Sequence, residues 1–170
     1  MKRTHFYKTY KSPVGELKLV ASDAGLSAVL WEDDDPNRVR FDTLVENNTH
    51  PILLRAEKEM SEYFNGERTV FTLPLDPIGT KFQNRVWEAL SRIPFGQTKT
   101  YGQLAGELGN ANASRAVGAA NGKNPIAIVV PCHRVIGASG ALTGFAGGLE
   151  VKEHLLTLEG VKNFHAPKKK

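Results

Sequence analysis

The segment at residues 74–79 constrains the fold of this chain most, because its two prolines and its glycine interrupt regular secondary structure. The chain also changes character there. Residues 1–77 carry 10 Lys and Arg against 13 Asp and Glu, a net charge of −3, whereas residues 78–170 carry 12 against 5, a net charge of +7. We therefore predict two domains, 1–77 and 78–165, followed by a basic tail at 166–170.

The first domain has the pattern of a small α/β unit. Apolar residues alternate or cluster at 6–11, 16–22 and 26–31, and turn-forming residues separate these segments, so the pattern predicts an antiparallel meander. The acidic run 32–35 breaks the last strand and is interpreted as a solvated loop, because nothing fixes its carboxylates relative to one another. Helical spacing of apolar residues then predicts a helix from Pro51 to Phe64.

The second domain has the pattern of a helical domain. Four helices are predicted: from the cap Thr80 through Ile93, over 101–108, from the cap Asn112 through Ala120, and over 150–159. The valine and the leucines of the last helix are expected to face the core. The second and third helices have helix-turn-helix spacing, which by itself indicates DNA binding only weakly, since helix pairs are common.

The third of these helices consists of small residues apart from one long side chain, Arg115. Small residues such as Ser114 and Gly118 allow a helix to approach a duplex closely, and a single protruding arginine can enter the base stack. A basic domain beside an acidic one also indicates a surface for a polyanion. The alternative is an ordinary helix pair with a solvated arginine.

The pentapeptide Pro131-Cys132-His133-Arg134-Val135 contains the only cysteine of the chain and lies behind the apolar run 126–130. This run is predicted to be a buried strand that ends at the proline and fixes the position of the thiol. A thiol nucleophile needs a base, and His133 follows it directly. Taken alone, a buried cysteine beside a histidine is more often structural.

A single cysteine excludes an internal disulfide and the paired thiolates of most structural zinc sites, so no metal and no cofactor are expected. No signal segment opens the chain, and no apolar stretch approaches the roughly 20 residues that a membrane helix needs. We expect a soluble monomer in a reducing compartment, the cytoplasm. The glycine-rich segment 137–148 is interpreted as turns or as one wall of a pocket for a flat ligand, and not as a phosphate loop.

Several motifs in unbroken order over residues 79–160 together resemble the signature of the O6-alkylguanine-DNA alkyltransferases. They are Tyr101-Gly102-Gln103-Leu104-Ala105, Ser114-Arg115-Ala116-Val117-Gly118, Asn124-Pro125, Pro131-Cys132-His133-Arg134-Val135, and Lys152-Glu153 with Leu155-Leu156 and Glu159-Gly160. The resemblance implies a ribonuclease-H-like domain over 1–77 and a winged-helix-like domain with a helix-turn-helix over 78–165. Its partner would be double-stranded DNA that contains O6-alkylguanine.

The resemblance also implies a chemistry. Cys132 would accept the alkyl group from O6 of guanine, and the protein would act once because a thioether has no easy route to hydrolysis. His133 would take the thiol proton through a water, and Glu159 would orient His133 and stabilise its charge. Asn124 would hold the backbone that presents the thiol. Tyr101 would place its hydroxyl near the N3 edge of the leaving guanine.

The base has to leave the duplex before it can react, and the resemblance implies that Arg115 fills the gap. The residues implied in binding DNA or the base are Ser114, Arg115, Gly118, Arg134, Phe145, Ala146 and Gly147. Two positions depart from the family pattern. Phe145 stands where many relatives have tyrosine, which removes one hydroxyl contact, and His154 stands where tryptophan is frequent, which is expected to affect packing.

Three other functions stay open at this point. A hydrolase with the same Cys132, His133 and Glu159 would turn over and would not need a helix-turn-helix. A protein that binds alkylated DNA without catalysis would share the DNA surface but would lack the acceptor cysteine. A transcription regulator would read base edges with long polar side chains, which the Ala- and Gly-rich third helix lacks.

Overall fold

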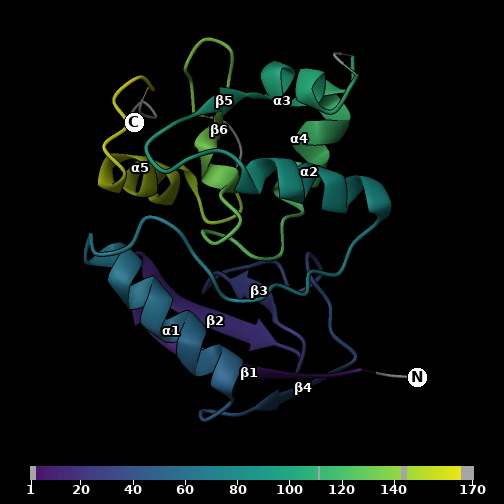
Figure 1. Cartoon of the computed structure of the whole chain (residues 1–170), viewed down its shortest axis with the longest axis vertical. Coiled ribbons are helices and arrows are strands. Elements are labelled where there is room, and N and C mark those ends of the chain that lie inside the picture. The colour runs from purple at the N-terminus through teal and green to yellow at the C-terminus, as the bar shows by residue number, and fades with distance from the viewer. Residues whose placement is uncertain (1–2, 111, 143–144, 166–170) are drawn as a thin grey trace. The chain divides into compact units, whose positions relative to one another are not determined.

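The computed structural model describes residues 3–110, 112–142 and 145–165. The chain divides into two compact units, Met1–Ile78 and Gly79–Lys170, named here the N-terminal and the C-terminal unit (Figure 1). The predicted boundary after residue 77 lies one residue from this division. The predicted basic tail and Gly144 of the glycine-rich segment lie outside the described residues.

The N-terminal unit is a four-stranded sheet in the order β3-β2-β1-β4, with one helix packed against it (Figure 1). Its elements are β1 (Thr4–Ser12), β2 (Gly15–Ala21), β3 (Leu26–Leu30), β4 (Thr43–Glu46) and α1 (Pro51–Phe64). The first three strands form the predicted antiparallel meander. β4 was not predicted. It pairs parallel to β1 and makes the sheet mixed.

α1 begins and ends where the sequence predicts. Pro51 occupies the first turn, where its missing N–H costs nothing, and the His50 side chain accepts a hydrogen bond from the backbone N–H of Ile52. The helix stops at Asn65, and Gly66 follows at φ +77°, a left-handed conformation that glycine adopts without strain. The buried face of the helix, which includes Met60, faces β1 and β2.

The C-terminal unit consists of four α-helices, one short 3-10 turn and a pair of short strands within the described residues. They are α2 (Lys81–Ser91), β5 (Lys99–Thr100), α3 (Tyr101–Glu107), α4 (Ser114–Gly122), the 3-10 turn Cys132–Arg134, β6 (Val135–Ile136) and α5 (Leu149–Leu158). α2, α3 and α4 pack on one another, and the Trp87 indole N–H donates to the Ala120 carbonyl at 2.9 Å. β5 and β6 pair in parallel.

The ends of these helices follow the capping chemistry of the sequence in two cases and depart from it in one. Thr80 and Thr100 each form a capping box with the glutamine three residues later. The predicted cap Asn112 is wrong, because the residue at the start of α4 is Ala113 and no side chain caps this end. α3 and α4 remain consecutive helices, and the connection between them, 108–113, is two residues longer than the predicted 109–112.

Candidate active site

The backbone that presents Cys132 is a compact turn, so the predicted strand over 126–130 is wrong. The Val129 N–H donates to the Ala127 carbonyl at 2.8 Å, which closes a three-residue turn around Ile128. The Cys132 N–H donates to the Val130 carbonyl at 2.8 Å and closes a second such turn around Pro131. Burial of an apolar run is common to strands and buried turns, and periodicity does not separate them.

The first of these turns is strained. Ile128 has a φ of +73°, and a β-branched side chain in this left-handed region is an outlier that costs on the order of 1–3 kcal/mol. Asn124 lies across the turn: its side-chain amide donates to the Val130 carbonyl at 2.8 Å and its side-chain oxygen accepts from the Ile126 N–H at 3.0 Å. These two hydrogen bonds support the role that the resemblance implies for Asn124.

His133, the residue after Cys132, forms a buried pair with Glu159. The 3-10 turn Cys132–Arg134 carries both Cys132, which is 6% exposed, and His133, which is fully buried. His133 Nε2 lies 2.7 Å from Glu159 Oε2. An ionised carboxylate only accepts, so Nε2 carries the hydrogen and Nδ1 of the neutral ring is left as an acceptor. Among the described residues, this buried Nδ1 has no hydrogen-bond partner.

The environment keeps Glu159 ionised and His133 uncharged. Burial alone would raise the pKa of Glu159, but the hydrogen bonds from His133 and Arg134 and the charge of Arg134 hold it well below its usual range. Burial lowers the pKa of His133; the hydrogen bond and charge of Glu159 oppose this, and Arg134 and Lys152 add to the lowering. A neutral imidazole with a free Nδ1 is the form that can accept a proton at neutral pH.

Arg134 lies inside the unit, although the resemblance implied that it binds DNA or the base. Its residue is 6% exposed, and its guanidinium makes a two-point ion pair with Glu159, with Nε at 2.8 Å from Oε1 and Nη2 at 3.0 Å from Oε2. Its Nη1 donates to the Ile93 carbonyl at 2.6 Å. These acceptors hold the guanidinium inside the unit, so we assign Arg134 no DNA contact.

Lys152 is the site residue that sequence reasoning missed. It belongs to α5 and is fully buried, although the helical pattern places charged residues on the solvent face. Burial lowers the pKa of Lys152 to about 8, and the interaction with Cys132 opposes this by raising it. Its ammonium lies 5.9 Å from the ring centroid of Phe145. The sequence signal was the Lys-Glu pair in the family motif, to which no chemistry was attached.

The remaining predicted residues lie on two parts of the C-terminal unit. Arg115 is exposed on α4, and Ser114 and Gly118 are half-buried on the same helix. A Cβ added at Gly118 would lie 3.8 Å from the ring of Tyr101, an ordinary contact, so packing against Tyr101 does not require glycine there. The first residue of α3 and the exposed surface of α4 are thus adjacent, as a shared base and DNA surface needs.

The second part is the glycine-rich loop. Phe145 and Gly147 are half-buried and Ala146 is exposed, so this loop presents backbone at the surface. The ring of Phe145 lies beside the ammonium of Lys152, and this contact links the loop to α5. His154 is exposed on α5, so its side chain is not part of the buried core.

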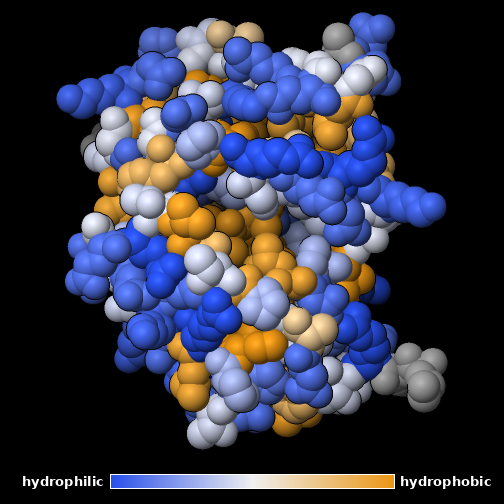
Figure 2. Space-filling view, in the orientation of Figure 1, coloured by the Kyte–Doolittle hydropathy of each residue, from blue (hydrophilic) through white to orange (hydrophobic). Residues whose placement is uncertain are grey.

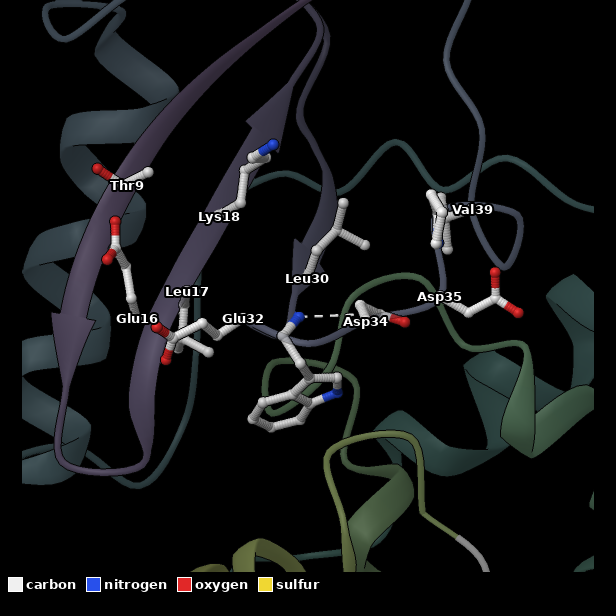
Figure 3. Close-up of a pocket in the computed structure, with 11 residues that line it drawn as sticks. Thr9, Glu16, Leu17, Lys18, Leu30, Glu32, Asp34, Asp35 and Val39 are labelled. Atoms are coloured by element: carbon white, nitrogen blue, oxygen red, sulfur yellow. Dashed lines mark hydrogen bonds between the residues drawn. The ribbon is translucent and has the colours of Figure 1, made fainter.

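The N-terminal unit also contains a pocket, with a volume of about 360 Å³ (Figure 3). It lies between the ends of β2 and β3 and the loop after them, where the Trp31 N–H donates to Asp34. Glu16, Glu32 and Asp35 line it, and their charges disfavour a phosphate or another anion. None of the predicted site residues borders this pocket.

Two negative findings apply to the described residues alone. No group of three or more His, Cys, Asp or Glu side chains is arranged to hold a metal ion. No helix among them has the length and apolarity to cross a membrane.

Comparison with protein families gives two adjoining matches. The ribonuclease-like domain of 6-O-methylguanine DNA methyltransferase matches residues 5–77, and the DNA binding domain of the same family matches residues 81–161. The ribonuclease-like and DNA-binding folds that the resemblance implied are thereby confirmed.

Individual relatives align with this chain over nearly its full length. The methylated-DNA-protein-cysteine methyltransferase of Methanosarcina acetivorans is 48% identical over 155 residues, which cover 91% of this chain and 98% of the relative. The constitutive enzyme of this name from Bacillus subtilis is 42% identical over 161 residues, with coverages of 92% and 96%. The crystal structure of Mycobacterium tuberculosis OGT in complex with DNA has a TM-score of 0.81, 44% sequence identity and a coverage of 92% of each chain.

Proposed function

This chain belongs to the 6-O-methylguanine DNA methyltransferase family, and from that premise we propose that it repairs DNA by moving the alkyl group of O6-alkylguanine onto its own Cys132. The observation that carries the proposal is the buried pair of Glu159 with His133, the residue after Cys132, in which Nδ1 of the imidazole is left free to accept. The reaction consumes the protein, so it is a stoichiometric methylated-DNA-protein-cysteine S-methyltransferase.

The first step is removal of the thiol proton. The thiolate of Cys132 is the nucleophile, and a free cysteine with a pKa of about 8.5 is mostly protonated at pH 7. His133 Nδ1 takes the proton through one water, and the imidazolium that forms is stabilised by Glu159. The ammonium of Lys152 favours the thiolate by its charge.

The second step is displacement at carbon. The sulfur of Cys132 forms a bond to the methyl carbon as the bond from that carbon to O6 breaks, and the electron pair of the broken bond goes to the guanine. The hydroxyl of Tyr101 donates toward the N3 edge while charge builds on the ring. The guanine then takes a proton on N1, which replaces the one that the thiol lost. The product thioether cannot be hydrolysed by any of these groups.

The reacting carbon lies inside the duplex, so the nucleotide must be turned out at a cost of a few kcal/mol. α4 supports this step because its small side chains allow the helix to approach the duplex closely, and Arg115 is its one exposed long side chain. We place the base between Tyr101 and the loop 145–147, whose backbone supplies hydrogen bonds. The reduced thiol that this reaction needs is maintained in the cytoplasm, which we propose as the compartment.

The test is intact-protein mass spectrometry after incubation with a duplex that contains one O6-methylguanine. We expect the mass of one methyl group on each protein molecule, and peptide mapping should assign it to Cys132. Repaired DNA beside an unmodified protein would indicate a hydrolase or a demethylase instead. Binding of the lesion without repair or modification would indicate a non-catalytic damage binder.

Replacing Arg115 by alanine separates base flipping from chemistry. Arg115→Ala should slow repair of O6-methylguanine in duplex DNA by about tenfold, because the extrahelical base loses the side chain that fills its place. Reaction with the free base O6-benzylguanine, which needs no flipping, should stay within about twofold. Single-turnover rates on both substrates measure this. Tyr101→Phe is the comparison, since it should slow both reactions, and equal losses for Arg115→Ala would contradict the flipping role.

The surface charge predicts which unit holds DNA. Hydrophilic residues cover most of the C-terminal unit in the view of Figure 2, and its net charge of +7 contrasts with −3 for residues 1–77. Affinity for undamaged duplex should fall steeply with salt, because each phosphate contact releases condensed counterions. Lys123→Gln, at the exposed end of α4, should reduce the magnitude of the salt slope by about one.

Lys11→Gln is the matched control for this measurement, because Lys11 is an exposed lysine of the N-terminal unit. Its salt slope, measured by fluorescence anisotropy over a salt series, should equal that of the unaltered protein. A slope that Lys11→Gln reduces and Lys123→Gln leaves unchanged would place the DNA surface on the other unit.

A further inference from the structure

Arg134 is the charged residue of the C-terminal unit whose position the proposed reaction does not explain. It is buried, it follows His133 directly, and it shares Glu159 Oε2 with that histidine: His133 Nε2 lies at 2.7 Å and Arg134 Nη2 at 3.0 Å from this one oxygen. The other carboxylate oxygen, Oε1, accepts from Arg134 Nε at 2.8 Å and from the Gly96 N–H at 3.3 Å. Glu159 is therefore fixed at both oxygens.

We propose that Arg134 is a positioning residue of the acceptor site, which keeps His133 uncharged and correctly oriented by holding Glu159 in a two-point ion pair. This inference rests on the proposed function, because it assigns His133 the role of proton acceptor for Cys132. It replaces the DNA contact that the sequence suggested for Arg134.

The charge balance of the cluster gives the reason. A buried carboxylate with no other partner attracts a proton to the histidine beside it, and the histidine then holds that proton and cannot take one from a thiol. With Arg134 in place, Glu159 and Arg134 together are neutral, so a resting imidazolium would be an additional buried positive charge. The cluster therefore favours the neutral ring before the reaction and still offers Glu159 Oε2 when the ring becomes charged.

Orientation follows from the same contacts. Arg134 also donates from Nη1 to the Ile93 carbonyl at 2.6 Å, and its guanidinium lies 5.9 Å from the ring centroid of Phe95. The segment just after α2 thus holds the guanidinium, the guanidinium holds the carboxylate, and the carboxylate holds the imidazole. A planar fork with several donors can do this, whereas a lysine ammonium offers a single point of charge.

The groups that face His133 come from two elements. α5 and its C-terminal residue contribute Lys152 and Glu159, and the turn of His133 itself contributes Cys132 and Arg134. α2 also packs against this turn, but the buried side chains of α2 are apolar or small. Its charged residues Lys81, Arg85 and Glu88 are exposed. Arg134 and Lys152 are thus the two cations that oppose a charge on His133, and burial of the ring acts in the same direction.

The test is the pH profile of single-turnover methyl transfer at saturating duplex DNA, together with an NMR titration of the His133 ring. In Arg134→Met, which keeps the side-chain length without the charge, the acid limb of the profile should move up by about one unit and the His133 titration should move with it. Arg134→Lys, which restores the charge without the fork, should move both by less. Arg92→Met, which removes an exposed arginine of the same unit, should leave both unchanged.

Three outcomes would overturn the inference. A uniform loss of rate at all pH values would show that Arg134 only supports the fold, and an unchanged His133 titration would show that it does not act through the histidine. A shift of the acid limb to lower pH would show that Arg134 does not oppose a charge on His133. If Arg134→Met does not fold, the comparison of Arg134→Lys with Arg92→Met decides. If the unaltered protein transfers no methyl group, the proposed function fails while the titration still tests the link between Arg134 and His133.

Discussion

Cys132→Ser should abolish methyl transfer while leaving binding to O6-methylguanine duplex within about twofold of the unaltered protein. A hydroxyl is a far weaker nucleophile than a thiolate near pH 7, and the change removes no contact that the DNA surface uses. Serine also fits the buried position, since it is smaller than cysteine by the difference between oxygen and sulfur. Mass spectrometry should detect no methyl group on this variant, and anisotropy should detect the complex.

The unaltered protein should repair no more than one lesion per molecule. With excess substrate, repair should stop when each protein molecule has gained one methyl group, because no neighbouring group can remove an alkyl group from a thioether. Repair that continues beyond one equivalent would contradict the acceptor role of Cys132, and so would transfer by Cys132→Ser. Loss of DNA binding together with transfer would instead indicate a folding defect, which the thermal unfolding midpoint would report.

Lys152→Met should make the protein more stable and less reactive. Burial lowers the pKa of Lys152 to about 8 from 10.5, so the folded state disfavours its ammonium at pH 7, and an apolar side chain of similar length should stabilise the fold by about 1–3 kcal/mol. The same change removes the positive charge that favours the thiolate of Cys132. Methyl transfer at pH 7 should therefore slow by about tenfold.

The pH dependence of stability checks the cause. Because the pKa of Lys152 is lower in the folded than in the unfolded state, the unfolded chain binds more protons between pH 8 and 10.5, and stability should rise with pH across this window. In Lys152→Met this rise should be absent. Lys162→Met, which replaces an exposed lysine nearby in the chain, should change neither the slope nor the rate. A Lys152→Met variant that is less stable at pH 7 would contradict the account.

Local chemistry made much of the fold predictable. The α1 boundaries follow from Pro51, from apolar spacing and from Asn65-Gly66, and the start of α2 follows from the capping box at Thr80. β4 was missed because it is only four residues long and its apolar residues do not alternate with polar ones. It forms by pairing with β1, and the first pair, Thr4 with Thr43, is separated by 39 residues in the sequence. Such pairing depends on the assembled sheet and leaves no periodic signal.

The active site, too, was predictable from the sequence only in part. Cys132, His133 and Glu159 were predicted because a specific motif marks them, and the structure brings the last two together. The positions of Lys152 and Arg134 were not predictable, because a pattern of apolar spacing treats every lysine and arginine as solvated. Their burial depends on partners that the fold supplies from elsewhere, Glu159 for Arg134 and the neighbourhood of Cys132 for Lys152.

The slight exposure of Cys132 has a consequence for the lifetime of the protein before it meets a lesion. Because the protein acts only once, any side reaction at Cys132 inactivates it. A thiolate is the form of cysteine that is oxidised and alkylated most readily. Because Cys132 as a residue is only 6% exposed, its sulfur offers dissolved reagents little surface. Duplex DNA, by contrast, delivers the alkyl group on a base that enters the site. Burial thus limits side reactions of Cys132 without lowering its reactivity toward a base bound in the site. The protein therefore keeps an unmodified thiol until it binds a lesion.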